Sequence, residues 1–547
     1  MGGGLMQLVA YGAQDVYLTG NPQITFWKVT YRRHTNYAME SIEQTFNGQA
    51  DFGRRVQCTI SRNGDLAYRT YLQVTLPEIC QENCCGSTGS DTWARWLDFP
   101  GEQLISMVEV EIGGQRIDRQ YGDWMHIWNQ LTLTAEQERG YNKMIGHTTQ
   151  LTYLIDPSFA DIERACGGAG PAAVCAPRKC LPETTLYVPL QFWFCRNPGL
   201  ALPLIALQYH EVRINLELRP SDEVLWAVSA LGGTSSPGAG KTVKQTAAYQ
   251  KSLVATSLYV DYIFLDTDER RRMAQNPHEY LIEQLQFTGD ESVGSSSNKI
   301  KLNFNHPCKE LIFVVQKDEN VDYCASFVEG NALCEAFGAQ PFNYTDALDA
   351  LPNSISAFAA KETVEDNAGF IGTKGLFQDA GADFTSIGSA GDASADLHES
   401  WDYYASNVGH ASAEGSNVSD AGAFVLAETA LNMHCWGQNP VVTCKLQLNG
   451  QDRFSEREGT YFDLVQPFQH HTRSPDTGIN VYSFSLRPEE HQPSGTCNFS
   501  RIDNATLQLV LSANTVGNDS TAKVRVYTTN FNVLRIMSGM GGLAYSN

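Results

Sequence analysis

Short runs in which apolar and polar residues alternate recur along the whole chain. These runs are residues 72–76, 108–112, 212–218, 300–304, 445–448, 481–486, 505–511 and 523–527. Successive side chains of a β-strand point to opposite faces, so each run predicts a strand with one buried and one solvated face. Segments rich in Gly, Pro, Asn and Asp separate the runs. This pattern is typical of antiparallel β-sandwiches, and we predict an all-β fold.

The order of these runs repeats once along the sequence. In each copy a strand ends in a tight turn that requires positive φ, at Gly113-Gly114 and at Asn449-Gly450. An aromatic strand follows in each copy, at 186–194 and 481–486, and then an irregular link and two closing strands. The length of 547 residues also exceeds what one hydrophobic core usually serves. The sequence therefore predicts two copies of one β-domain in tandem.

The repeat divides the chain into segments. We expect an N-terminal arm at 1–26, a first sandwich at 27–266, a polar connector at 267–279 and a second sandwich at 280–547 with a large surface insertion at 321–444. The insertion holds 17 acidic residues against two lysines. So long a connection is usually functional or disordered, and its charge predicts that it lies on the surface.

The formal net charge of the chain is −22. Phosphate backbones would repel so acidic a protein, so direct binding of nucleic acid is not expected. The most apolar stretch, 199–207, contains Pro203 and is too short to span a bilayer, and the N-terminus shows no signal peptide or lipidation motif.

One segment has the spacing of a helix rather than a strand. Trp124, Ile127, Trp128 and Leu131 recur at helical spacing, and Thr134-Ala135-Glu136-Gln137 predicts a capping box that opens a second short helix. We interpret such helices as decorations of the loops.

No motif in the sequence satisfies the spacing of a catalytic, cofactor or metal site. Gly232–Thr242 ends in Gly-Lys-Thr but lacks the first Gly of a phosphate loop. The pairs His210-Glu211 and His278-Glu279 lack the second His of a zinc protease helix. His470-His471 lies near a predicted strand end, where adjacent side chains face opposite ways and cannot easily share a metal. We predict no catalytic residue, no cofactor and no metal.

Cysteines and asparagines offer two kinds of candidate modification. Cys80, Cys84, Cys85, Cys166, Cys175 and Cys180 cluster in Gly/Pro-rich segments, where local disulfides are plausible and zinc spacing is missing. Five Asn-x-Ser/Thr sites are candidates for N-glycosylation, and they are Asn343, Asn417, Asn498, Asn504 and Asn518. Asn498 and Asn504 could instead be buried hydrogen-bonding residues.

The opening segment GGLMQLVAYGAQDVYLTGNPQITF, residues 3–26, closely resembles the N-terminus of chlorovirus major capsid proteins, within the nucleocytoplasmic large DNA viruses. The resemblance continues in both halves, through 60–66, 111–118, 198–211, 278–289, 448–454, 493–506 and 532–545. It implies a double jelly roll, two tandem eight-stranded antiparallel β-sandwiches, in a non-enzymatic coat protein.

The resemblance also implies partners and a location. Homotrimers would form pseudo-hexagonal capsomers that tile an icosahedral shell over an inner viral membrane, in a virion assembled in the host cytoplasm. The arm would lie at the inner face and join neighbouring capsomers, minor capsid proteins or vertex proteins. One alternative is a capsid paralogue at special shell positions. The other is a carbohydrate-binding or carbohydrate-active jelly-roll protein, and only Trp401 and Trp436 support it.

Overall fold

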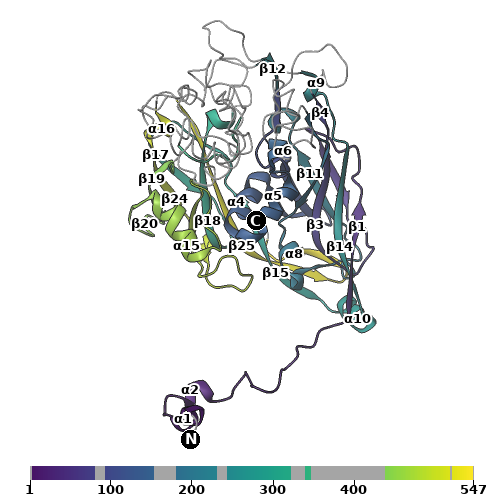
Figure 1. Ribbon diagram of the computed structural model, residues 1–547, viewed down its shortest axis with the longest axis vertical. Helices are drawn as coiled ribbons and strands as arrows, with labels where there is room; N and C mark the ends of the chain where they lie inside the picture. Colours follow the sequence, from purple (N-terminus) through teal and green to yellow (C-terminus); the bar gives the residue numbers. More distant parts are fainter. Residues whose placement is uncertain are drawn as a thin grey trace, which may run out of the picture.

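The computed structural model describes residues 3–80, 93–152, 180–230, 243–244, 246–321, 339–346, 438–517 and 520–545. Two β-sandwiches stand side by side, with strands running roughly along the long axis of the molecule, and an N-terminal arm projects from one end (Figure 1). No helix among these residues is long and apolar enough to cross a membrane.

The first sandwich, roll 1, has two antiparallel sheets. One has the strand order β1-β14-β3-β9, with β1 Tyr37–Gln44, β14 Ala255–Leu265, β3 Leu66–Leu76, β9 Thr184–Pro189 and the short β10 Leu202–Pro203 beside β3. The other has the order β2-β11-β6-β7, with β2 Arg55–Thr59, β11 Val212–Leu218, β6 Ile105–Ile112 and β7 Gln115–Tyr121. Small sheets join β5 Trp93–Trp96, β12 Leu225–Ala230 and β13 Val243–Lys244, and β4 Ile79–Cys80 with β8 Cys180–Leu181.

The second sandwich, roll 2, is built in the same way. Its first sheet has the order β15-β25-β18-β22, with β15 His278–Phe287, β25 Ala522–Met537, β18 Pro307–Lys317, β22 Asn480–Ser483 and the short β16 Glu291–Val293, β23 Cys497–Asn498 and β26 Met540–Leu543. Its second sheet has the order β17-β24-β19-β20, with β17 Ser297–Leu302, β24 Ala505–Leu511, β19 Val441–Leu448, β20 Gln451–Asp452 and β21 Arg457–Glu458.

The two rolls have the same strand order. If the eight principal strands of each roll are numbered along the chain, one sheet reads 1-8-3-6 and the other 2-7-4-5 in both rolls. This order is that of a jelly roll, and it confirms the predicted fold of two like sandwiches in tandem.

The repeated turn joins strands four and five of each roll, as the sequence predicts. Gly113 and Gly114 have φ of 59° and 83°, and Asn449 and Gly450 have φ of 50° and 81°. Two successive residues with positive φ give the hairpin turn whose twist matches that of the flanking strands.

We expect Gly113→Ala to destabilise roll 1 more than Gly114→Ala does. Both residues have positive φ, which costs a residue with a Cβ about 1–2 kcal/mol. A Cβ on Gly113 would also lie 2.4 Å from His210 Nδ1, whereas a Cβ on Gly114 would meet nothing within 4 Å. Urea unfolding of the two variants measures the difference, and equal losses would show that His210 moves away freely.

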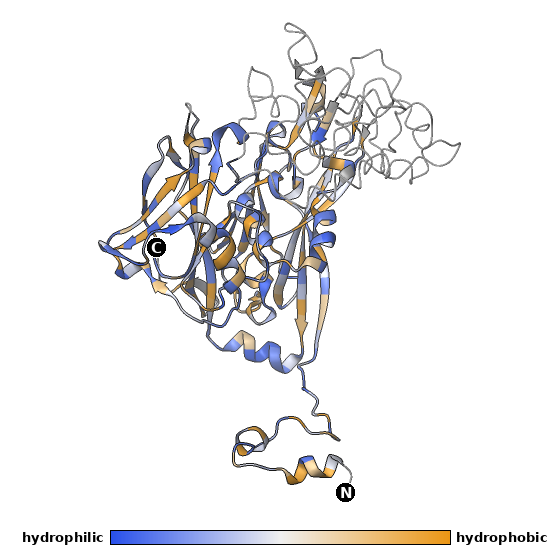
Figure 2. Cartoon of the chain, turned by 60° about the vertical axis from the view of Figure 1, so that its left-hand side comes forward, coloured by the Kyte–Doolittle hydropathy of each residue, from blue (hydrophilic) through white to orange (hydrophobic). Residues whose placement is uncertain are grey.

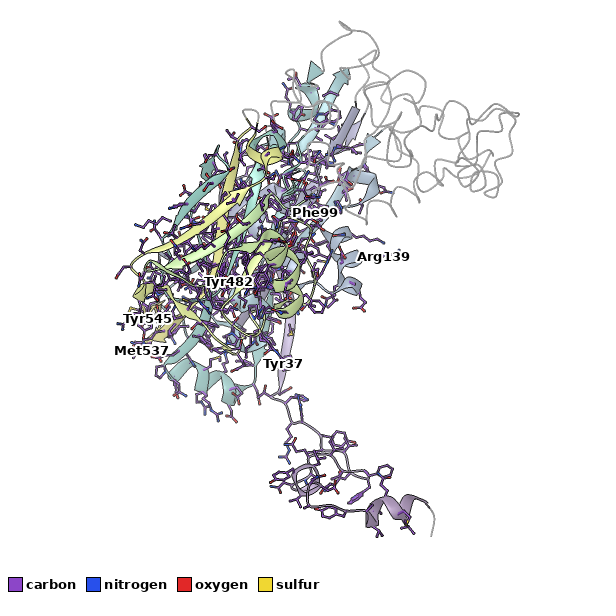
Figure 3. The ribbon with its side chains drawn as sticks, turned by 90° about the vertical axis from the view of Figure 1, so that its left-hand side faces the viewer. Tyr37, Phe99, Arg139, Tyr482, Met537 and Tyr545 are labelled. Atoms are coloured by element: carbon purple, nitrogen blue, oxygen red, sulfur yellow. The ribbon has the colours of Figure 1, made fainter. Side chains whose placement is uncertain are left out.

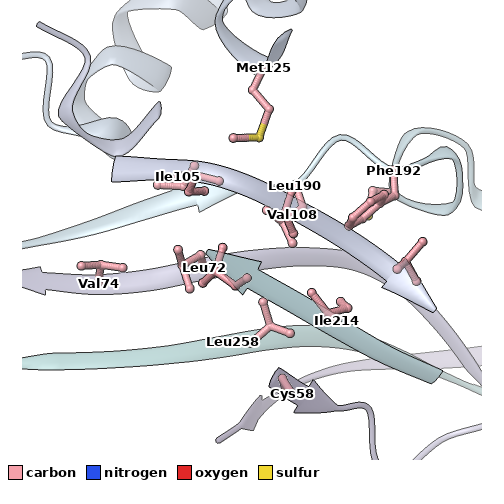
Figure 4. Close-up of a cluster of buried hydrophobic side chains, with 14 of the residues drawn as sticks. Cys58, Leu72, Val74, Ile105, Val108, Met125, Leu190, Phe192, Ile214 and Leu258 are labelled. Atoms are coloured by element: carbon pink, nitrogen blue, oxygen red, sulfur yellow. The ribbon is translucent and has the colours of Figure 1, made fainter. Parts of the chain in front are cut away.

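Each roll has a hydrophobic core between its two sheets, and Ile282, Leu534 and Ile536 of roll 2 belong to the cluster that fills roll 1. Figure 4 shows Leu72, Val74 and Leu258 from one sheet of roll 1 facing Val108 and Ile214 from the other. A second cluster fills roll 2. Hydrophobic residues lie along the strands, while α10 below them is hydrophilic (Figure 2).

Helices connect and flank the strands. They are α1 Gly3–Val9, α2 Val16–Thr19, α3 Pro100–Leu104, α4 Gly122–Thr132, α5 Ala135–Ile145, α6 Thr149–Thr152, α8 Trp193–Arg196, α9 Thr246–Tyr249, α10 Thr267–Gln275, α15 Gln466–His470 and α16 Ala513–Val516, with the π-helix η8 Tyr461–Val465 and the 3-10 turns η3 Pro198–Leu200, η4 Ser221–Glu223, η5 Asp318–Val321 and η9 Phe499–Arg501. The predicted helices at 124–131 and after Thr134 are confirmed, but the Thr134 side chain makes no capping hydrogen bond. The predicted strand 186–194 ends at Pro189, because Trp193 and Phe194 belong to α8 and pack into the core of roll 1.

The structure moves several of the predicted segment boundaries. The arm extends to residue 36, and Tyr37 marks where it meets the body (Figure 3). Helix α10 fills most of the predicted connector, and β15 begins at His278. The prediction of a surface insertion is wrong for 339–346, because Phe342 and Tyr344 are buried in a cluster between the rolls. It is also wrong at its end, where β19 begins at Val441.

Candidate functional site

The junction between the two rolls brings buried aromatic and charged side chains of both rolls together. Helix α4, from the connection after β7 of roll 1, lies against the outer face of the β15-β25-β18-β22 sheet of roll 2 (Figure 1). The buried cluster comprises Trp124, Ile127, Trp128 and Leu131 of α4 with Ile312, Val314, Val481 and Tyr527 of roll 2. The predicted apolar stripe of α4 therefore joins the rolls and is not a loop decoration.

Aromatic rings and one carboxylate fix α4 in place. The ring centroids of Trp124 and Tyr527 are 5.6 Å apart. Asp123, at the start of α4, pairs with Arg525 of roll 2 at 2.6 Å and with Arg219 of roll 1 at 3.4 Å. Burial alone would lower the pKa of Arg525, but the carboxylates of Asp123 and Asp290 raise it above its ordinary value.

A buried ionic cluster lies nearby on the same face of roll 2. The carboxylate of Glu283 in β15 contacts Lys309 Nζ at 2.8 Å and Arg196 of roll 1 at 3.3 Å. Burial would raise the pKa of Glu283, but His491, Lys309 and Arg196 lower it to about 2. The carboxylate is therefore charged at neutral pH, and it forms ion pairs with Lys309 of roll 2 and Arg196 of roll 1.

His471 lies between two carboxylates. Its Nε2 is 2.9 Å from Glu310 and its Nδ1 is 2.9 Å from Glu489, and its side chain is fully buried. Burial would lower the pKa of this imidazole, but Glu310 and Glu489 raise it to about 9. The predicted strand position of His470-His471 is wrong, because α15 ends at His470 and the next residue turns into the protein.

We expect the stability of the protein to fall as pH rises from about 6.5 to 9, and His471→Gln to remove that slope. The pKa of His471 is higher in the folded protein than in the unfolded chain, so its protonation stabilises the fold fully below the unfolded pKa. This contribution is lost as pH rises through the folded pKa of about 9. The shift corresponds to roughly 3 kcal/mol. Urea midpoints from pH 6 to 10 measure it, with His470→Gln as the control that keeps the slope. An unchanged slope in His471→Gln would contradict this assignment.

A small cavity lies between the rolls beside Glu283 and Arg196. It has room for about one water molecule, and polar side chains including Asp118, Gln120, Arg196, Glu283 and Gln284 line it. Burial raises the pKa of Asp118 to about 6. So small a space fits a structural water and not an organic substrate.

The residues of the other candidate motifs lie apart from one another. His210 Nδ1 is 3.0 Å from the carbonyl oxygen of Gly541, and His278 Nε2 is 2.6 Å from that of Met273, so both have structural contacts. Within the described ranges, no group of three His, Cys, Asp or Glu side chains could hold a metal. Cys84, Cys85, Cys166 and Cys175, Gly232–Thr242, and Trp401 and Trp436 lie outside the described residues, whereas Cys80 and Cys180 are partners in the β4–β8 pair.

The candidate glycosylation sites differ in accessibility. Asn498 and Asn504 are exposed, so the alternative of buried hydrogen-bonding residues is wrong for both. Asn343 is half-buried, and its amide donates to Gln340 Oε1 at 2.7 Å while its Oδ1 accepts from Thr345. Asn417 and Asn518 lie outside the described residues.

Comparison with known proteins identifies the family. The profile of large eukaryotic DNA virus major capsid proteins matches residues 269–542, and that of the major capsid protein N-terminus matches 25–266. The chain belongs to the major capsid protein family of large eukaryotic DNA viruses. Each roll of the capsid protein corresponds to one of the two profiles.

Relatives match this capsid protein over its full length. It is 70% identical to the major capsid protein of Chrysochromulina ericina virus and 72% identical to that of Phaeocystis pouchetii virus, each over 100% of both chains. The resemblance to chloroviruses is confirmed at 38% identity to the major capsid protein of Paramecium bursaria Chlorella virus 1. The solved PBCV-1 virus capsid superposes with a TM-score of 0.61 at 32% identity, covering 96% of this chain and 100% of that one.

Sequence patterns alone did not reveal the buried ionic residues of the junction. Glu283 stands beside Gln284, and Lys309 stands beside Glu310, so each looks like part of a polar, solvated stretch at a strand end. The signal that could have revealed them is the unbroken apolar run Leu311-Ile312-Phe313-Val314-Val315, which indicates a strand buried on both faces.

Proposed function

We propose that this capsid protein forms homotrimers that act as pseudo-hexagonal capsomers in an icosahedral virion shell. The observation that supports this is the repeated strand order, because three copies of two like rolls place six similar sandwiches around a threefold axis. The strands of both rolls run along one direction, as six rolls arranged in a ring require (Figure 1).

Sedimentation of the purified protein tests the trimer. The expected mass is about three times the 60.4 kDa of the chain. A species that stays at the mass of one chain at all concentrations would overturn the proposal.

The arm supports a second part of the proposal, attachment to other shell components. Its large apolar side chains, such as Leu8, Tyr17, Phe26 and Trp27, are exposed and make no core contact in the described structure. Such an arm gains order by binding neighbouring capsomers, minor capsid proteins or vertex proteins on the side of the shell that faces an inner membrane.

We expect deletion of residues 1–26 to leave trimers intact and to stop shell assembly in the host cytoplasm. Normal particles from the deleted chain would contradict this role.

The proposed role is structural and requires no catalysis, cofactor, metal or nucleic acid. Roll interiors are filled by apolar side chains, and the junction cavity has room for about one water molecule, so these regions offer no substrate cleft.

We expect glycans at Asn498 and Asn504 in virions and none at Asn343. Transfer of a glycan needs an accessible side-chain amide, and only the first two of these are exposed. The amide of Asn343 is occupied by Gln340 in a half-buried turn. Glycopeptide mass spectrometry of virions measures occupancy, with Asn504→Gln as the control, and a modified Asn343 would contradict the assignment.

A further inference from the structure

The contact between the two rolls of one chain supplies a template for contacts between chains. Helix α4 lies between the fifth and sixth principal strands of roll 1, β7 and β9, and it covers the outer face of the 1-8-3-6 sheet of roll 2. In roll 2 the connection between the fifth and sixth strands, β20 and β22, carries η8 and α15. The segment 461–470 therefore occupies the place in roll 2 that α4 occupies in roll 1.

Segment 461–470 exposes an apolar surface that the described part of the chain leaves uncovered. Leu464 is 54% exposed and Phe468 is 82% exposed, and they lie four residues apart on one continuous helical stretch. Leu486 is 73% exposed, and its carbonyl oxygen lies 3.0 Å from His470 Nδ1 at the end of α15. We call Leu464, Phe468 and Leu486 the apolar knob.

The face that would receive the knob is also uncovered. Tyr71 of β3, Tyr187 of β9 and Tyr259 of β14 lie on the outer face of the 1-8-3-6 sheet of roll 1, because their neighbours Leu72, Leu186 and Leu258 point into the core. The ring centroids of Tyr71 and Tyr259 are 5.5 Å apart and stacked, and those of Tyr71 and Tyr187 are 6.3 Å apart. We call these three residues the tyrosine face.

The corresponding face of roll 2 shows how much a covering helix buries the strands beneath it. Every residue of β18 after Pro307 is buried, whereas in β3 Tyr71 and Gln73 remain half-exposed. Tyr259 pairs with Tyr71 across its sheet as Tyr527 pairs with Ile312 in roll 2. Tyr527 and Ile312 are covered by α4, and Tyr259 and Tyr71 have no such cover among the described residues.

The two surfaces lie on opposite sides of the molecule. In Figure 1, α15 lies on the left side of the molecule, in roll 2, while β1, β14 and β3 lie on the right side, in roll 1, with α4 between them. Surfaces on opposite sides of a subunit associate head to tail. Such contacts close into a ring of three when each one rotates the next copy by one third of a full turn. Tyrosine-rich faces and aromatic anchors are typical of such interfaces.

We propose that the apolar knob of one copy packs on the tyrosine face of the next copy, and that three such contacts close the trimer. This inference rests on the proposed trimer and identifies the surface that forms it. Each contact between copies then repeats the geometry of the α4 contact within a copy, so six rolls make six similar contacts around the ring.

Sedimentation of surface variants tests the contact. We expect Phe468→Glu and Tyr187→Glu each to weaken trimer association roughly 30-fold or more, as removal of an interface anchor does. Both side chains are exposed in the single chain, so circular dichroism should remain that of the unchanged protein. Val442→Glu, at an exposed apolar residue of β19 outside both surfaces, is the matched control and should remain trimeric.

A cross-link gives a second measurement that does not depend on loss of assembly. We expect the double variant Phe468→Cys and Tyr187→Cys to form a disulfide between copies on mild oxidation, identified by mass spectrometry of the linked peptides, and Val442→Cys with Tyr187→Cys to form none. If the unchanged protein is a trimer but Phe468→Glu remains one and no link forms, this contact is wrong while the proposed function stands. If the unchanged protein is a monomer, both are wrong.

Discussion

Trp124→Ala should cost the protein about 3–5 kcal/mol of its free energy of unfolding, the range for removing a large buried aromatic residue. Trp124 is fully buried and contacts Trp128 and Tyr527, so the substitution leaves a cavity between the two rolls. Because the lost contacts lie between the rolls, we expect the substitution to weaken the coupling between the rolls and to broaden the unfolding transition. Urea titration followed by far-ultraviolet circular dichroism measures both effects.

Trp27→Ala is the matched control for this prediction. Trp27 lies in the arm and is 86% exposed, so the same substitution there should change the unfolding midpoint very little. If Trp124→Ala were as mild as Trp27→Ala, α4 would not hold the rolls together.

Glu283→Gln should destabilise the protein by about 3–5 kcal/mol, because it removes the carboxylate that pairs with buried Lys309 and with Arg196. The carboxylate of Glu283 is 2.8 Å from Lys309 Nζ, and Lys309 is itself buried. The pKa of Glu283 is lowered to about 2, so its contribution is present above the ordinary glutamate pKa and is lost as pH falls towards 2. Urea midpoints between pH 2.5 and 7 measure both the loss and its pH dependence.

Glu279→Gln is the control in the same strand. Its ion pair with Arg535 is about half exposed on both sides, and such pairs contribute about 0–1 kcal/mol. Equal effects of the two substitutions would show that the buried cluster contributes no more than a surface ion pair.

Local patterns predicted the turns and most strands because these features depend on neighbouring residues, although the runs 300–304 and 481–486 extend past the ends of β17 at Leu302 and β22 at Ser483. The run 505–511 forms β24 with the predicted bounds, and the turns at Gly113-Gly114 and Asn449-Gly450 have the predicted positive φ. The aromatic run 186–194 was predicted less well, because Trp193 and Phe194 pack into the core as a helical turn, which period-two alternation cannot indicate.

The candidate site was harder to predict because its parts are distant in the sequence. Asp123 and Arg525 are 402 residues apart and meet only when roll 2 packs on α4. The stripe of Trp124 and Trp128 predicted a helix with a buried face, but nothing near it in the sequence says which surface it packs on. Phe342 and Tyr344 fill the same junction, although they come from a stretch whose composition is acidic and polar.

By itself the sequence determined that this protein is a tandem pair of antiparallel sandwiches, because alternation and turn residues act over a few positions and recur in the same order twice. Only the tertiary structure decided how the rolls join. Burial of a helix face, a carboxylate or a histidine depends on which distant surface covers it, and that surface exists only after both rolls have folded.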